Sequence, residues 1–213
     1  NYKNFINQAR LTKNPDIELE EVGVPHKLTW DRCKLETISF GHGITTTPLQ
    51  VTALYSAMVN GGNLIIPSLI KDRKIKKKKS IISSQTSYEL REILRKVVSS
   101  EEGTASLADK NGYNVGGKTG TAESYGDKKN RINTFISYFP SNNPKYSFFI
   151  MLENPKINKN LVYNYRGIKT KAPYNTSGWN SVYVAGKIIE KIGPILAINN
   201  EDFTDHYVAE KLN

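Results

Sequence analysis

Three glycines around a single lysine place the strongest constraint on this sequence. The run from Gly116 to Thr121 reads GGKTGT and lies in a stretch of β-forming and small residues. Glycines thin a strand, so that a ligand or another backbone can approach it closely. In a regular strand Lys118 and Gly120 share one face, whereas Thr119 and Thr121 share the other. A pocket that uses all four residues must therefore lie at the edge of the strand, where free backbone N–H groups can donate hydrogen bonds to a ligand.

Three further blocks precede this run. Residues 38–50 read ISFGHGITTTPLQ, residues 57–67 read AMVNGGNLIIP, and residues 102–105 read EGTA. Together with GGKTGTAE at 116–123, they resemble in order and spacing the later part of the transpeptidase domain of class B penicillin-binding proteins. The run around Lys118 then corresponds to the K-T-G motif of that family.

This resemblance implies a fold and a domain assignment. The fold is α/β (α+β), an antiparallel sheet packed with helices as in penicillin-binding proteins and serine β-lactamases, and it is incomplete in this chain. Residues 1–198 are expected to form the C-terminal portion of a transpeptidase domain, and residues 199–213 a polar tail. In the family a serine is acylated by the D-Ala-D-Ala end of a peptidoglycan stem peptide, and the acyl group passes to an amine. The same serine traps penicillins and other β-lactams.

The resemblance also assigns roles to four residues. Lys118 supplies positive charge near the second-motif serine and the substrate carboxylate, and the hydroxyls of Thr119 and Thr121 bind that carboxylate. The N–H of Thr121 is one of two oxyanion donors, a contribution of about 3–4 kcal/mol in other acyl-transfer enzymes. The substrate lies extended beside the strand at Gly120, so recognition is partly strand addition. No cofactor and no metal are expected.

Two other motifs of the family have only letter matches here. Ser68-Leu69-Ile70-Lys71 matches S-x-x-K, but it follows Pro67 in an extended segment, whereas the nucleophile belongs at the start of a buried helix. Ser141-Asn142-Asn143 matches S-x-N, but it comes after the K-T-G motif in an expected hairpin turn. We therefore expect the sequence to begin downstream of S-x-N, to hold one wall of an active site and to be inactive alone.

Two alternatives to a transpeptidase are weighed, one suggested by the charge of the chain and one by the shared fold. The formal net charge is +10 and the sequence pI is about 9.5, which suits a nucleic-acid or anionic-surface binding module. Most of the excess lies in one run from Lys71 to Lys79, as in a solvated loop, so we expect no nucleic acid. A β-lactamase or a β-lactam sensor domain is the alternative on the same fold. The blocks at 41–50 and 60–67 favour the transpeptidase.

The expected location follows from the family. No apolar run approaches the roughly 20 residues of a membrane span, and the N-terminus has no signal-peptide pattern. Class B members have one N-terminal transmembrane helix, so the resemblance implies a bitopic inner-membrane protein with this domain in the periplasm and its anchor outside this chain. Gly178-Trp179-Asn180 favours the septal type, with membrane-bound division or cell-wall synthesis proteins as partners.

Apolar periodicity predicts two helices before the motif. Thr47 as cap, Pro48 and Gln50 start the first, and its inward residues are expected at Val51, Leu54, Tyr55 and Met58. The second runs from about Gln85 to Val98 with Ser84 or Thr86 as cap, and its inward residues are expected at Leu90, Ile93, Leu94 and Val97.

The rest of the chain predicts a sheet and a covering helix. Strands are expected at 113–122, 132–139 and 146–152, the last two as a hairpin, followed by a long loop to Tyr174. A last helix opens at Trp179-Asn180 and ends at Gly193-Pro194, with Val182, Ala185, Ile189 and Ile192 inward. The outer edge of strand 146–152 and its Phe-Phe-Ile-Met side chains lack cover in this chain, so we expect the isolated chain to self-associate through this edge or to need the rest of the protein for solubility.

Overall fold

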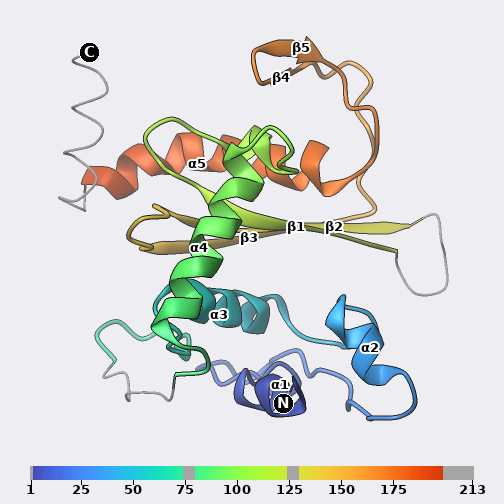
Figure 1. Ribbon diagram of the computed structural model, residues 1–213, viewed down its shortest axis with the longest axis vertical. Helices are drawn as coiled ribbons and strands as arrows, with labels where there is room; N and C mark the ends of the chain where they lie inside the picture. Colours follow the sequence, from blue (N-terminus) through green and yellow to red (C-terminus); the bar gives the residue numbers. More distant parts are fainter. Residues whose placement is uncertain (1, 74–79, 124–129, 199–213) are drawn as a thin grey trace. The chain divides into compact units, whose positions relative to one another are not determined.

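The computed structural model describes residues 2–73, 80–123 and 130–198. The chain forms two compact units, Asn1–Leu90 and Arg91–Asn213. Helix α4, Ser84–Ser99, is labelled in Figure 1. The boundary between the two units, at Leu90 and Arg91, falls within this helix. The lysines at 74–79 and the tail at 199–213, both interpreted above from composition, lie outside the described residues.

Three further helices belong to the first unit: α1 Tyr2–Gln8, α2 Lys34–Ser39 and α3 Pro48–Val59. Helix α3 starts with the predicted capping box. The Thr47 Oγ1 accepts from the Gln50 N–H at 3.3 Å, and the Gln50 Oε1 accepts from the Thr47 N–H at 3.1 Å. Because this reciprocal pairing satisfies two N–H groups, it fixes the first turn.

The buried face of α3 differs from the predicted one. Of the four residues expected to point inward only Tyr55 is buried, whereas Ala57 and Val59 are exposed by 0% and 2%. The reason lies in the next helix, where the Ser87 Oγ of α4 donates to the Met58 carbonyl at 2.8 Å. The first turns of α4 therefore enclose the end of α3.

Helix α4 has the predicted extent but not the predicted cap. Ser83 caps it, because its Oγ accepts from the Thr86 N–H at 3.0 Å. The expectation of Ser84 or Thr86 was wrong by one to three residues, a usual error where several hydroxyls stand in a row.

The inward face of α4 is also shifted. Leu94 is buried as predicted, but Ile93 is 58% exposed, and the remaining two predicted positions are half-buried. The buried positions are Ser87, Leu94 and Val98. Since Ser87 is polar, the apolar stripe in the sequence did not reveal the direction of this face.

The second unit is built on one antiparallel sheet, in the order β1-β2-β3. Its strands are β1 Gly116–Glu123, β2 Arg131–Phe139 and β3 Tyr146–Glu153, as predicted within a few residues. Thr119 pairs with Phe135, and Phe135 pairs with Ile150. Directly opposed residues share a face of a sheet, so one face carries a motif threonine at its edge and large apolar residues further in.

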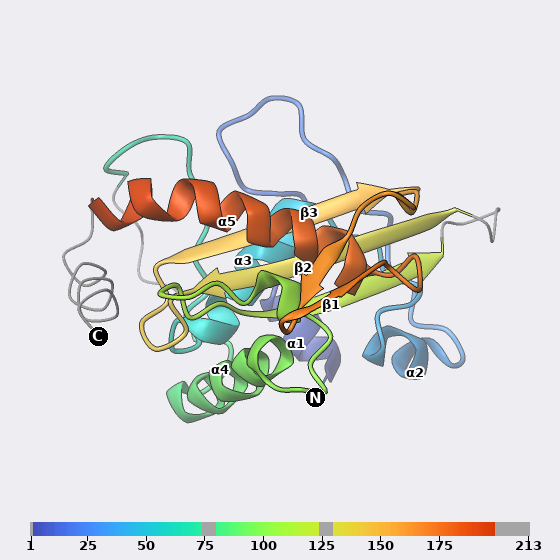
Figure 2. The same ribbon diagram turned by 90° about the horizontal axis from the view of Figure 1, so that it is seen from above.

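Helix α5, Ser181–Ile198, lies across this face of the sheet (Figures 1 and 2). Val182, Ala185 and Ile189 were predicted to point inward, and all three are fully buried with Phe135 in the main core cluster. Helix and sheet therefore bury their apolar faces against each other, which is the largest source of stability in this unit.

Helix α5 continues past Gly193-Pro194, so the predicted end was wrong. Proline removes one helical hydrogen bond, but Leu196 beyond it still packs against the core cluster. Tertiary packing here outweighs the local signal. Gly193 has a different role, because an added Cβ would lie 2.4 Å from the Tyr113 ring.

A two-stranded ribbon occupies part of the region predicted as a long loop. It consists of β4 Tyr163–Tyr165 and β5 Ile168–Thr170, which pair antiparallel. Both residues of its turn have positive φ, 53° at Arg166 and 81° at Gly167. This is the turn geometry of a tight hairpin, and the Tyr-Asn-Tyr-Arg-Gly sequence could have indicated it.

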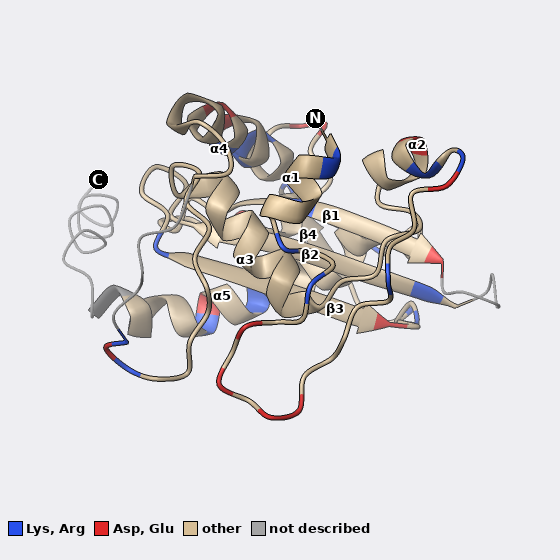
Figure 3. Cartoon of the chain, turned by 90° about the horizontal axis from the view of Figure 1, so that it is seen from below, with Lys and Arg blue, Asp and Glu red and all other residues tan. Residues whose placement is uncertain are grey.

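Charged residues are spread over helices, strand ends and loops, with acidic positions among the basic ones (Figure 3). None of the described helices has both the length and the apolar character needed to cross a bilayer.

A glycine inside α5 tests the packing of this helix. An added Cβ at Gly186 would lie 2.5 Å from the backbone oxygen of Leu107. Alanine normally favours a helix by about 1 kcal/mol, but here we expect Gly186→Ala to lower the free energy of unfolding by about 1–2 kcal/mol because of the clash. Urea denaturation measures it.

Gly23→Ala is the matched control, since its Cβ would meet Thr47 Cγ2 at an ordinary 3.6 Å. Gly186→Ala with wild-type or higher stability would contradict the packing described for α5.

Candidate functional site

A cleft of about 390 Å³ lies beside β1 in the second unit. Four segments line it: the loop before β1, alternate residues of β1, the end of β4, and the 3-10 helix η2, Ser177–Trp179. The lining residues are Glu102, Gly103, Thr104, Thr119, Thr121, Tyr165, Thr176, Ser177, Gly178 and Trp179. The cleft therefore joins the EGTA block and part of the K-T-G run.

Each motif threonine in the cleft has a hydroxyl partner. The Thr119 and Thr104 Oγ1 atoms lie 3.0 Å apart, and the Thr121 Oγ1 lies 2.8 Å from the Ser177 Oγ. The Ser177 Oγ also donates to the Gly120 carbonyl. The hydroxyls of Thr119 and Thr121 are thus held on the same side of β1, as strand alternation predicts.

Lys118 lies on the opposite face of β1 from the two threonines. It is exposed, it does not line the cleft, and its Nζ donates to the Thr119 carbonyl at 2.8 Å. Among the described residues β1 pairs only with β2, so its other edge is open to a ligand. The structure therefore brings Thr119 and Thr121 together on one face of β1. Lys118 is accessible to a ligand on the opposite face, next to the same unpaired edge.

Two aromatic residues, Tyr165 and Trp179, form one wall of the cleft, and the sequence indicated only Trp179, as the start of the last helix. The Tyr165 and Trp179 rings stack with centroids 5.0 Å apart, and the Tyr163 ring meets Trp179 edge-on at 5.4 Å. Stacked rings offer a rigid apolar surface to a ligand.

Asn175 anchors the segment that carries η2. Its Oδ1 accepts from Asn180 at 3.0 Å and from Asn133 of β2 at 3.4 Å, and its Nδ2 donates to the Pro155 carbonyl at 2.7 Å. Because one amide side chain ties three segments together, η2 is fixed beside β1. No spacing in the sequence indicated this network.

The letter matches to the two other family motifs lie where the sequence analysis expected them. Ser68 lies in no helix, and its Oγ donates to the Glu18 Oε1 at 2.7 Å. Ser141 lies in the turn between β2 and β3. Neither serine stands at the start of a buried helix.

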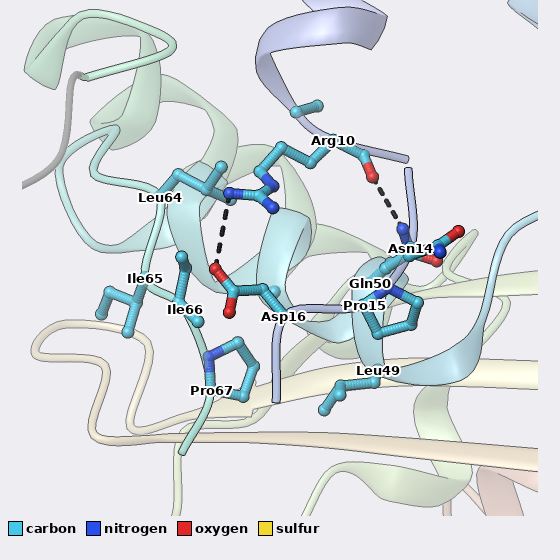
Figure 4. A pocket seen from close by; sticks show the side chains of 12 residues that line it. Arg10, Asn14, Pro15, Asp16, Leu49, Gln50, Leu64, Ile65, Ile66 and Pro67 are labelled. Carbon is cyan, nitrogen blue, oxygen red and sulfur yellow. Dashed lines mark hydrogen bonds and ion pairs between the residues drawn. The ribbon is translucent and has the colours of Figure 1, made fainter. Parts of the chain in front are cut away.

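A small cavity of about 40 Å³ lies within the first unit (Figure 4). Arg10 and Asp16 form an ion pair of 3.6 Å at its wall, and the Gln50 Nε2 donates to the Arg10 carbonyl at 2.7 Å. Arg10, Asp16 and Gln50 are engaged in these contacts, and most of the other lining residues are aliphatic. Within the described part of the chain, no three His, Cys, Asp or Glu residues are grouped as metal ligands would be.

The comparison with known families agrees with the fold and the motif. Residues 1–176 match the model of the penicillin binding protein transpeptidase domain. The chain is 33% identical over 214 residues to a probable peptidoglycan D,D-transpeptidase FtsI of Caulobacter vibrioides, and 40% identical over 136 residues to the stage V sporulation protein D of Bacillus subtilis. The chain therefore belongs to the penicillin-binding protein transpeptidase family, as a class B member.

The similarity covers most of this chain but a smaller part of its relatives. It extends over 92% of the chain and 34% of the Caulobacter protein, and over 56% and 21% for the Bacillus protein. The transpeptidase domain of penicillin-binding protein 3 from Burkholderia pseudomallei has the same fold, with a TM-score of 0.72 and 22% identity. That match covers 91% of this chain and 56% of the Burkholderia chain, so the chain spans about a third or less of the two curated relatives and about half of that domain.

The contacts of Glu18 predict an unusual titration. The pKa of the Glu18 carboxyl is lowered to about 2. The main cause is a hydrogen bond from the Ser68 side chain, and the second is a hydrogen bond from the Leu69 N–H. Because the pKa is lowered on folding, the stabilisation is present above pH 4.5 and is lost as the pH falls towards 2. We expect the Glu18 carboxyl carbon to titrate by NMR well below those of other glutamates.

Ser68→Ala should move this titration back towards the ordinary range, whereas Ser83→Ala, which removes a serine at the cap of α4, should leave it unchanged. An ordinary Glu18 titration in the wild-type chain would contradict the contact to Ser68.

Proposed function

We propose that this chain forms the K-T-G wall of the active site of a peptidoglycan D,D-transpeptidase. The observation that carries the proposal is the pair of hydroxyls of Thr119 and Thr121, held in one cleft beside the open edge of β1. In this proposal residues 1–198 are the C-terminal portion of the transpeptidase domain. Residues outside this sequence supply the S-x-x-K serine and the S-x-N motif.

In the proposed chemistry the two faces of β1 have different roles, carboxylate binding on the threonine face and positive charge on the Lys118 face. The hydroxyls of Thr119 and Thr121 bind the terminal carboxylate of a D-Ala-D-Ala stem peptide or the carboxylate of a β-lactam. The Thr121 N–H donates to the oxyanion that develops during acyl transfer. Lys118 provides fixed positive charge on the face where the serine motifs act, and the ligand lies along the strand at Gly120.

The names of the relatives favour this reaction over the alternatives. The Caulobacter protein and those of several Neisseria species are described as probable peptidoglycan D,D-transpeptidases. A β-lactamase or β-lactam sensor on the same fold would carry the same motif strand, but no such protein is among these relatives. A basic module without chemistry would not account for the cleft around the two hydroxyls.

The FtsI relative also supports a role in the septum. We propose a cell-division enzyme that is held in the inner membrane by an anchor outside this sequence, with this domain in the periplasm. Membrane-bound division proteins would then be partners of the whole protein.

Lys118→Ala tests the proposal. In the protein expressed from its complete gene, we expect this change to slow acylation by a fluorescent penicillin on the order of 100-fold, because it removes a positive charge from the site. Denaturing gels at timed intervals give the rate. Lys169→Ala is the matched control, since Lys169 is an exposed lysine on β5.

The 213-residue chain alone should remain unlabelled in the same assay. A labelled band that disappears in Ser68→Ala would contradict the assignment of the nucleophile to residues outside this sequence. Near-wild-type labelling of Lys118→Ala would show that the active site lies elsewhere.

We also propose that the isolated chain self-associates through β3. Its outer edge has no strand partner among the described residues, and Met151 is 51% exposed. The prediction that all four apolar side chains lack cover was wrong for Phe148 and Ile150, because both pack against the core cluster. The features of β3 that favour self-association are its unpaired edge and the face of the sheet opposite the core cluster, which carries Phe149 and Met151.

Sedimentation of the chain alone at micromolar concentration is expected to show oligomers. Met151→Lys should reduce them, because a charge at an edge strand opposes pairing with another chain. A stable monomer with protected amides in β3 would refute this proposal and leave the enzymatic one untouched.

A further inference from the structure

Ser177 is enclosed although it lines an open cleft. It is 1% exposed and makes three contacts with β1. Its Oγ donates to the Gly120 carbonyl, its Oγ lies 2.8 Å from the Thr121 Oγ1, and its N–H donates to the Thr121 Oγ1 at 3.3 Å. Its own carbonyl accepts from the Ser181 Oγ at 3.2 Å, which fixes the residue from the side of α5.

The number of hydrogens decides which group donates in this cluster. A serine hydroxyl has one hydrogen, and a backbone carbonyl has none. The contact between the Ser177 Oγ and the Gly120 carbonyl therefore uses the single hydroxyl hydrogen of Ser177. Across the 2.8 Å contact the Thr121 hydroxyl must then be the donor and the Ser177 Oγ the acceptor.

In this arrangement Thr121 presents no hydrogen to the cleft. Its hydroxyl hydrogen points to the Ser177 Oγ, and one of its lone pairs accepts from the Ser177 N–H. The hydroxyl has only one lone pair left for a ligand, and a lone pair repels an anion. Thr121 can therefore bind a carboxylate only after the hydrogens in the cluster have turned.

The cluster permits this reversal without moving a heavy atom. The Ser177 hydrogen turns from the Gly120 carbonyl to the Thr121 Oγ1, and the Thr121 hydrogen turns into the cleft. The Gly120 carbonyl keeps a second side-chain donor, the Thr134 Oγ1 at 3.2 Å, so this carbonyl is not left without a donor. The reversed chain, Ser177 to Thr121 to anion, is aligned head to tail, and such hydrogen bonds strengthen one another.

We propose that Ser177 is the positioning residue that holds and reorients the Thr121 hydroxyl for an anionic ligand of this cleft. The inference rests on the proposed function, because that function identifies the anion as a stem-peptide or β-lactam carboxylate. Thr119 differs, since its partner Thr104 is exposed and makes no comparable set of contacts.

A double-mutant cycle tests the inference in the protein expressed from its complete gene. With benzylpenicillin, Ser177→Ala should lower the second-order acylation rate about fivefold to tenfold, the effect of one hydrogen bond. In a Thr121→Val background, where the hydroxyl is absent, the same change should alter the rate by less than about twofold. A merely structural serine would cost the same in both backgrounds.

Ser137→Ala is the matched control, because Ser137 is also fully buried and its Oγ also donates to a backbone carbonyl, that of Phe148 at 3.3 Å. It should leave the rate within about twofold of wild type. If Ser177→Ala does not fold, Ser177→Cys replaces it in both backgrounds, since the thiol keeps the side-chain shape but donates weakly.

The outcomes separate the two proposals. If the wild-type protein is labelled but the Ser177 variant reacts at the wild-type rate, or is impaired equally in both backgrounds, the role of Ser177 is overturned and the transpeptidase assignment stands. A wild-type protein that benzylpenicillin does not acylate overturns the proposed function itself.

Discussion

Burial of one face of the β1-β2-β3 sheet under α5 is the constraint on which the rest of the second unit depends. Phe135 of β2 and Val182, Ala185 and Ile189 of α5 are all fully buried in the same cluster. Close approach of the helix requires Gly186, where any side chain would meet the backbone of η1, Ser106–Ala108, at Leu107. Once α5 lies on the sheet, the short segment before it must pass the edge of β1.

The position of the cleft follows from the way the segment before α5 passes the edge of β1. The segment that enters α5 carries η2, and Asn175 and Ser177 fasten it to the sheet through side-chain amide and hydroxyl contacts. The cleft is therefore a by-product of how a helix begins beside an edge strand. Its polar side consists of threonine hydroxyls on β1, and its apolar side consists of Tyr165 and Trp179, which stack. In the proposed function, the hydroxyls on the polar side bind a carboxylate, and the stacked rings on the apolar side lie beside the chain that carries it.

Ser177 and Thr121 show why hydrogen direction matters at such a site. A hydroxyl can face a ligand with a hydrogen or with a lone pair, and only the first attracts an anion. A nearby buried hydroxyl that can be donor or acceptor allows the change at little cost in free energy.

The sequence by itself determined the motif strand, the hairpin that follows it, the capping box of α3 and three of the four predicted inward residues of α5, the fourth, Ile192, being half-buried. These features depend on local chemistry: strand alternation, a Thr-Pro-x-Gln start, and a spacing of three and four residues. The four motif residues could also be read from the sequence, together with the opposite directions of Lys118 and the two threonines.

Only the tertiary structure decided the rest. Local signals placed the end of the last helix at Pro194, but core packing of Leu196 carries the helix further. Apolar spacing predicted that Ile93 points inward, but the buried face of α4 contains Ser87, and Ile93 is exposed. Ser177 lies 56 residues after Thr121 in the chain, and no pattern of residue types links them. Such contacts depend on how α5 packs on the sheet, which is a property of the whole unit.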